Sequence, residues 1–345
     1  MRIPPQDERG PSTTGTLQPR YRRVLSFGDV LDEGIRLFRQ HWINFALVSA
    51  VGLLPPGLFS VWVSASSAFT NPFAVADFQS GGLPTLYADQ VQAQIAGLFA
   101  SLVLSGVFYC LWSAAVTATA ETYLRGGEPS LSSVYGRAAR RFFPVLFGTL
   151  LYALGLTLLS VVGIFLSVLA VFPGLGGIVP GVGLLVWWLR PGARKAWLKW
   201  LIIVCTPLGL LFYFGTRWSM YVAAAVIERR GPLASLRRSS ELIDRQVLRV
   251  LAILTVTSTI VAVLVYAPTA IIAIPLAISS GLLNYGSGTE AIITEAVAVV
   301  LRVLFQSVGA IIYTLVFIDL RNRHEGTDLD ERLTQLEAAP GTPGG

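Results

Sequence analysis

Two arginines lie inside stretches of the sequence that are otherwise apolar. Arg217 falls in a run from about 201 to 227, and Arg302 lies near the middle of a run from about 291 to 318. A charged side chain inside a membrane is costly unless a partner or water stabilises it, so each arginine is a candidate for handling an anion. Together with polar residues on neighbouring helical faces they form one candidate intramembrane polar site: Arg217, Tyr221, Tyr266, Glu295, Arg302 and Gln306.

Two interpretations of this intramembrane site are open. The polar faces could enclose a pocket or path for an anionic group, or they could form a satisfied polar network that fixes the register of the helices. Glu295 precedes Arg302 on the same face by seven residues, which is about 10 Å along a helix axis. A direct contact over that distance would be strained, so we expect the partner of Arg302 to come from another helix, with Tyr266 as a candidate.

Other residues that could support catalysis or bind a metal are few. The only histidines are His41 and His324, and the two cysteines, Cys110 and Cys205, both lie inside apolar runs. A histidine metal site or a serine triad has little to build on, and the glycine-rich loop of the phosphate-binding type is absent. The sequence therefore predicts a protein that is not an enzyme, without catalytic, cofactor or metal residues.

The elements that carry these residues are expected to be membrane helices. The 345 residues are 53% hydrophobic and 13% charged, with a mean hydropathy of +0.63, whereas soluble domains carry about 25% charged residues. Because about 20 apolar residues cross a bilayer as a helix, we predict an all-α, polytopic membrane helix bundle. Its six transmembrane helices cover about 43–65, 95–120, 142–172, 201–227, 247–278 and 291–318. They lie in a membrane domain over 25–333, between a disordered N-terminus at 1–24 and a disordered tail at 334–345.

An amphipathic segment precedes the first span. Ser26 and Asp29 have the spacing of a capping box, and apolar residues from Phe27 to Trp42 share one helical face. Such a helix lies at the membrane interface, although packing against the bundle is the alternative. Further along, Pro55 and Pro56 predict a kink or a division of the first span.

The same layout occurs three times along the chain. Val30, Val134 and Leu236 occupy corresponding positions in three amphipathic segments, at spacings of 104 and 102 residues. Each segment leads into two apolar runs and a charged exit. The sequence therefore predicts three repeated units of amphipathic helix plus helical hairpin, which pack as one bundle because a single hairpin cannot bury its packing face alone.

The basic residues are distributed asymmetrically between the two sides of this predicted bundle. About twenty of the 26 fall in the segments expected on one side, and the predicted loops 66–94 and 279–290 hold none. This is the positive-inside pattern, with both termini cytoplasmic. The exception is the basic segment 173–200, which could be an outer interfacial segment, a re-entrant loop or an extra span.

The clustering of arginines at the ends of apolar runs favours anionic lipid over nucleic acid as the partner of a chain with a net charge of +6. The residues expected to contact lipid headgroups are Arg36, Arg39, Arg140, Arg141, Arg237 and Arg238.

Four motifs together resemble a known group of proteins. They are Phe27 to Glu33 followed by Arg36, the Arg217-Trp218 pair, the run Gly231 to Ser239, and the run Asp319 to Leu329. Over about 25–333 the chain resembles bacterial integral membrane proteins related to the membrane domain of glycerophosphoryl diester phosphodiesterase. The resemblance implies a multi-pass protein of the bacterial cytoplasmic (inner) membrane without an assigned activity. The separate catalytic barrel domain of the phosphodiesterases has no counterpart in this sequence.

These observations lead to two expected functions. The first is a non-enzymatic scaffold or accessory subunit whose cytoplasmic helices contact the bilayer, anionic lipid headgroups or a membrane-protein partner. The alternative is a transporter or lipid-handling protein that uses the arginine-containing interior. A membrane-embedded phosphodiesterase is a third and weaker possibility.

Overall fold

The computed structural model describes residues 25–69, 85–171, 209–283 and 288–325. The predicted disordered termini and the segment 173–200 lie outside these described residues. Within them the regular secondary structure is entirely helical. The helices are α1 (Phe27–Phe69), α2 (Thr85–Leu124), α3 (Leu131–Arg140), α4 (Phe142–Val171), α8 (Tyr221–Ile227), α9 (Pro232–Ile243), α10 (Val247–Leu283) and α11 (Gly288–Glu325). Residues 209–218 form a further helix, joined to α8 by a turn at 219–220.

Six helical stretches are long and apolar enough to cross a membrane, as the sequence predicted. They are Phe27–Ala65, Ile95–Leu124, Phe142–Gly163, Gly209–Ile227, Val247–Ser279 and Thr289–Glu325. Large apolar side chains such as Leu102, Leu154 and Ile271 are exposed along them. A continuous apolar surface of this kind is unfavourable in water and suits contact with lipid. The all-helical class and the number of long apolar helices are therefore confirmed, while the repeated units remain a prediction.

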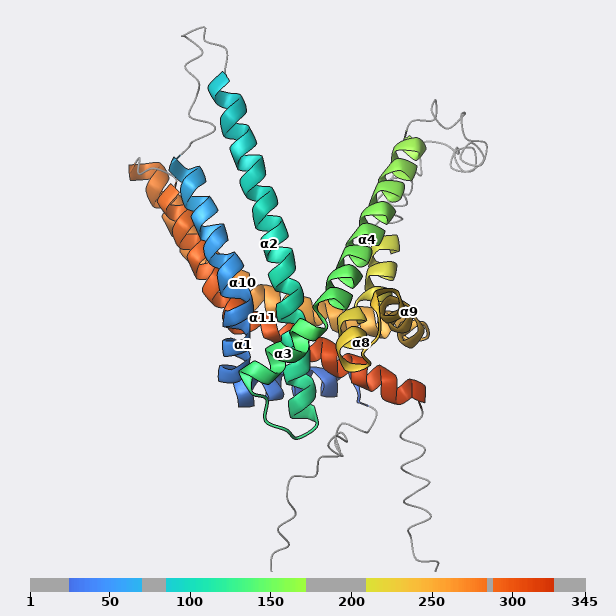
Figure 1. The fold of residues 1–345 in the computed structure, drawn as a ribbon. Helices are drawn as coiled ribbons and strands as arrows, with labels where there is room; N and C mark the ends of the chain where they lie inside the picture. The colour runs from blue at the N-terminus through green and yellow to red at the C-terminus, as the bar shows by residue number, and fades with distance from the viewer. Residues whose placement is uncertain (1–24, 70–84, 172–208, 284–287, 326–345) are drawn as a thin grey trace, which may run out of the picture.

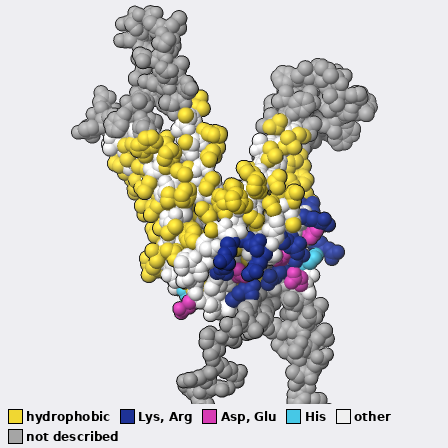
Figure 2. Space-filling model, viewed as in Figure 1, with side chains coloured by type: hydrophobic (Ala, Val, Ile, Leu, Met, Phe, Trp, Pro, Cys, Tyr) yellow, Lys and Arg dark blue, Asp and Glu magenta, His cyan; other side chains and the backbone are white. Residues whose placement is uncertain are grey.

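The long helices form two arms that diverge from a common end (Figure 1). One arm contains α1, α2, α10 and α11, and the other contains α4 together with the helix at 209–218. The short helices α3, α8 and α9 lie where the arms meet. Figure 2 shows that Lys and Arg side chains gather at this same end, next to the apolar surfaces of the arms. We call this part of the molecule, which holds α3, α8, α9 and the last turns of α11, the basic end.

The start of the first helix agrees with the sequence prediction, whereas its later part differs from it. Ser26 N–H donates to Asp29 Oδ2 at 3.0 Å, and Asp29 N–H donates to Ser26 Oγ at 3.2 Å, which confirms the capping box. Of the kink or division expected at Pro55 and Pro56, the division is wrong, because the helix continues through both prolines; the non-helical residue is His41, with φ −129° and ψ 26°. The amphipathic segment and the first span are thus one helix with a kink at His41.

The amphipathic part of α1 packs against α11. Val30 and Leu37 are buried, and a Cβ added at Gly34 would lie 2.5 Å from Ile312 Cγ1. Phe27 and Trp42 remain exposed. This segment therefore packs against the bundle, which was one of the two alternatives. Its exposed aromatic side chains can still contact the membrane interface.

The short helix α3 is fixed to α1 and α2. Ser130 caps its first turn, with its Oγ accepting from the Ser133 N–H. The Tyr135 hydroxyl donates to the Val48 carbonyl of α1 at 2.6 Å, and burial raises the pKa of Tyr135 to about 12. The phenol therefore stays neutral and keeps donating at any physiological pH. This contact holds the helix from which several arginines of the basic end project.

Candidate functional site

The structure places Arg302 in an ion pair with a residue of its own helix. Its Nη1 lies 3.1 Å from Glu295 Oε1, which also accepts a hydrogen bond from Ser60 of α1 at 2.8 Å. The expectation of a partner from another helix was wrong, because two long side chains on one face together span two helical turns. Tyr266 is 59% exposed, and among the described residues neither Tyr266 nor Gln306 is hydrogen-bonded to this pair.

Arg217 belongs to a different cluster. Its guanidinium lies 2.7 Å from Asp244 Oδ1 and 3.0 Å from the Tyr213 hydroxyl. Its carbonyl accepts from the hydroxyl of Ser239 on α9, at 2.7 Å. Arg217 therefore joins the helix at 209–218 to α9 and to the residue that follows α9. The structure gives Arg217 and Arg302 separate partners and does not bring them together in one polar interior.

Tyr221 lies in a third group, between the two arms. Its hydroxyl is 2.8 Å from Thr149 Oγ1 of α4, and its ring stacks on Tyr152 at 5.5 Å between centroids. Thr149 also accepts from Cys110 Sγ of α2 at 3.3 Å. These contacts link α2, α4 and α8 where the arms converge. The predicted intramembrane site is thus distributed over three local clusters, each of which fixes the packing of neighbouring helices.

A buried carboxylate, which the sequence analysis did not single out as a site residue, connects the two ends of the described chain. Asp319 of α11 is 2% exposed and accepts from the Leu25 N–H at 2.8 Å, from Arg249 at 3.0 Å and from Arg323 at 2.9 Å. Both arginines also donate to the Leu25 carbonyl, at 2.8 and 2.6 Å. Two signals in the sequence pointed to Asp319: its i, i+4 spacing from Arg323, and its place at the start of the motif Asp319 to Leu329.

The predicted headgroup contacts differ in how much of each side chain is available. Arg39, Arg140 and Arg237 are exposed, Arg36 pairs with Glu33, and Arg237 pairs with Glu241. Arg238 is different, since its side chain is only 11% exposed and pairs with Glu228 at 3.2 Å and with Glu325 at 2.7 Å. Arg238 is therefore engaged in joining α9 to α11, and little of it remains for a lipid.

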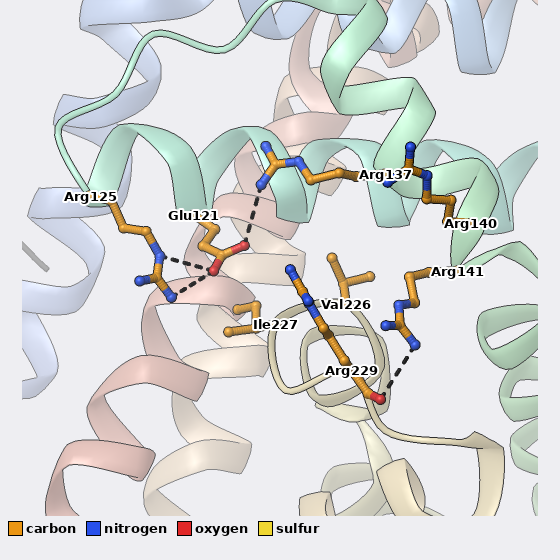
Figure 3. Close-up of a pocket in the computed structure, with 8 residues that line it drawn as sticks. All are labelled: Glu121, Arg125, Arg137, Arg140, Arg141, Val226, Ile227 and Arg229. Carbon is orange, nitrogen blue, oxygen red and sulfur yellow. Dashed lines mark hydrogen bonds and ion pairs between the residues drawn. The ribbon is translucent and has the colours of Figure 1, made fainter. Parts of the chain in front are cut away.

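A pocket of about 600 Å³ lies at the basic end (Figure 3). Its lining comes from the end of α2, from α3, from the residue that joins α3 to α4, and from α8 and the connection that follows it. The lining residues are Glu121, Arg125, Arg137, Arg140, Arg141, Val226, Ile227 and Arg229. Five arginines, one glutamate and two apolar side chains thus line the pocket. Of these arginines, sequence analysis had singled out Arg140 and Arg141 as headgroup contacts.

The charges of this pocket are only partly paired. Glu121 accepts two hydrogen bonds from Arg125, at 3.0 and 2.8 Å, and lies 3.7 Å from Arg137. Arg137 also donates to the Ala118 carbonyl at 3.1 Å and to Thr122 Oγ1 at 2.5 Å. Arg141 donates to the backbone carbonyl of Arg229 at 3.4 Å. Within the described chain, no ion pair joins Arg140, Arg141 or Arg229 to a carboxylate.

The described residues contain no group of three or more His, Cys, Asp or Glu side chains that could hold a metal ion. No known family model matches the chain, and neither a curated protein nor a solved structure matches it. The six long apolar helices and their exposed apolar surfaces indicate the class of the molecule, which is an all-α, multi-pass membrane protein.

Proposed function

We propose that this protein is a non-enzymatic scaffold or accessory subunit of the bacterial inner membrane, with its basic end against the cytoplasmic leaflet. The observation that carries the proposal is the gathering of arginines beside the apolar surfaces (Figure 2). An anionic surface attracts each nearby basic residue by about 1 kcal/mol. Arg36, Arg39, Arg140, Arg141 and Arg237 are the side chains proposed to contact its headgroups. Both termini are then cytoplasmic.

The contacts of the predicted polar residues favour a scaffold over a transporter. Arg302 is neutralised by Glu295, and Arg217 is paired with Asp244, so each arginine has a local carboxylate. Such pairs need no transported anion, and the bonds of their members to other elements, Ser60 to Glu295 and Arg217 to Asp244, hold the helices in register. We further propose that the chain is related to the membrane domain of glycerophosphoryl diester phosphodiesterases. We also propose that it is built from three repeated units.

A lipid-handling function is the second candidate. The two arms expose apolar surfaces that diverge from the basic end (Figure 2). An opening of this kind could accept a lipid from the side. Because the predicted transport arginines are paired, this candidate depends on the space between the arms and not on Arg302.

Translocation of a phospholipid, measured for the parent and for Arg302→Leu, separates the scaffold from the lipid-handling function. As part of a scaffold, Arg302→Leu should lower the thermal stability in detergent by about 1 kcal/mol, because the pair is partly exposed and Ser60 still donates to Glu295. Translocation of a fluorescent phospholipid in proteoliposomes should remain at the rate of protein-free liposomes for both the parent and the variant. Rapid translocation that Arg302→Leu keeps would favour lipid handling between the arms, whereas rapid translocation that Arg302→Leu abolishes would favour transport through the arginine.

The proposed orientation is tested by reporter fusions at three positions. Fusions after Glu128 and after Arg238 should report the cytoplasmic side, because both positions lie at the basic end. A fusion after Leu83 should report the opposite side, since it falls between the first two spans. An outside signal at Arg238 would contradict both the orientation and the model of two spans per unit.

A further inference from the structure

We propose that the pocket lined by Arg137, Arg140, Arg141 and Arg229 binds a phosphate group, and that the headgroup of a membrane phospholipid supplies it. The inference that a lipid supplies the phosphate rests on the proposed function, in which the basic end lies against the cytoplasmic leaflet. The recognition of phosphate rests on the pocket alone. Phosphate binding and its lipid source therefore have separate tests.

The first argument is the imbalance of charge in the pocket. Glu121 is already paired with Arg125 and Arg137, while Arg140, Arg141 and Arg229 line the same pocket without an ion pair to a described carboxylate. Positive charges that line one pocket repel one another, and an anion between them offsets this repulsion. Guanidinium groups match the geometry of phosphate oxygens and bind them with charge-assisted hydrogen bonds.

The second argument is the backbone of Arg229. This residue has φ of 57°, in the left-handed region where a side chain other than glycine is disfavoured. Its neighbour Arg230 is bound to Glu228 at 2.6 Å, whereas Arg229 extends into the pocket toward Glu121 (Figure 3). A glycine would fit this backbone better, yet an arginine occupies it. Strained conformations of this kind are concentrated at functional sites, which indicates a function for this guanidinium.

The third argument is that the elements around the pocket are fixed. The α3 helix is held by the Ser130 cap and by the hydrogen bond from Tyr135 to α1. The Arg137 guanidinium is oriented by the Ala118 carbonyl and Thr122. Arginines on elements that are already in place lose less conformational freedom when an anion binds, and this favours affinity.

The position and size of the pocket favour a lipid as the source of phosphate. Arg140 and Arg141 come directly before α4, whose Phe143 and Phe147 are exposed and apolar. Val226 and Ile227 contribute an apolar part of the lining. A phosphate in this pocket would lie at the border between the apolar helices and the charged surface, which is the level of lipid headgroups. A volume of about 600 Å³ leaves room for a headgroup larger than phosphate itself.

The test measures thermal stability of the full chain in phosphate-free detergent micelles, at fixed ionic strength, as each probe is titrated. The probes are inorganic phosphate, phosphatidylglycerol and phosphatidylcholine. Because a ligand that binds the folded state raises its stability with concentration, the titrations yield apparent dissociation constants. We expect saturable stabilisation by phosphatidylglycerol, with inorganic phosphate acting at higher concentration. If inorganic phosphate binds as tightly as phosphatidylglycerol, the phosphate site stands and its lipid source is overturned.

Two pocket variants and one matched control locate the binding. Arg229→Gly removes a guanidinium while suiting the backbone, and Arg140→Gln removes a charge at an exposed position. Each should weaken binding by about tenfold or more, as expected for a lost charge-assisted hydrogen bond. The control Arg245→Gln removes the same charge at an exposed position outside the pocket lining and should leave the dissociation constant unchanged.

The outcomes distinguish this site from the broader function. Equal weakening in Arg229→Gly and Arg245→Gln would overturn the pocket, because it would mean that total charge and not position decides binding. Binding of none of the probes would also overturn it. Neither result would alter the reporter-fusion test, which bears on the proposed function separately.

Discussion

Replacing Asp319 by alanine is expected to destabilise the protein more than any other single change considered for this chain. The carboxylate is buried, and its loss would leave Arg249, Arg323 and the Leu25 N–H without their shared acceptor. Removal of one partner from a buried ion pair costs about 3–5 kcal/mol. The apparent melting temperature in detergent should fall accordingly. Hydrogen exchange in the first turns of α1 should become faster, because the Leu25 N–H would lose its acceptor and the two arginines that also hold the Leu25 carbonyl would lose their shared carboxylate.

Two further variants show whether burial and charge cause this loss. Asp319→Asn should have a smaller effect than Asp319→Ala, because an amide oxygen can still accept from the Leu25 N–H. Asp244→Asn makes the same chemical change in a carboxylate that is 59% exposed and paired with Arg217 at 2.7 Å. Exposed pairs contribute at most about 1 kcal/mol, so this control should melt close to the parent. A loss for Asp244→Asn as large as that for Asp319→Asn would contradict the assignment.

Features set by neighbouring residues were predictable from the sequence. The capping box of Ser26 and Asp29 forms within four consecutive residues, and the six long helices follow from the lengths of the apolar runs. The prolines did not predict where helices end, because Pro55 and Pro56 both lie within α1. Neighbouring helices in a membrane protein can stabilise the backbone groups that a proline leaves unpaired, so a proline in an apolar run need not end the helix.

The contacts between distant residues could not be predicted in this way. Asp319 and Leu25 are separated by 294 residues, and the pairing of Arg217 with Asp244 depends on how α9 folds back. Periodicity assigned Arg217 and Arg302 to polar faces, but it carried no information about which carboxylate each would meet. The basic pocket likewise requires Arg137 and Arg229 to be brought together from α3 and the α8–α9 connection, which only the tertiary arrangement shows.

The second large effect is expected at Gly52, where α1 and α2 are in close contact. A Cβ at this position would lie 2.6 Å from Trp112 Cβ, 3.2 Å from Trp112 Cα and 3.1 Å from the Tyr135 hydroxyl. Trp112 is fully buried and donates to Ser49 at 3.0 Å, so its backbone and side chain have no free space into which to move. Gly52→Ala must therefore push the two helices apart. Overpacking of this kind costs about 1–3 kcal/mol, and the loss should appear as a lower melting temperature in detergent.

Gly106→Ala is the matched control, because it makes the same substitution inside α2 where an added Cβ meets nothing within 4 Å. Alanine is the better helix former, so Gly106→Ala should be neutral or stabilising by up to about 1 kcal/mol. The Gly52 variant should also expose Tyr135, since its hydrogen bond to the Val48 carbonyl lies beside the new methyl group. If Gly52→Ala and Gly106→Ala melt at the same temperature, the close approach of α1 to Trp112 does not exist in the folded protein. The positioning of α3 would then need another explanation.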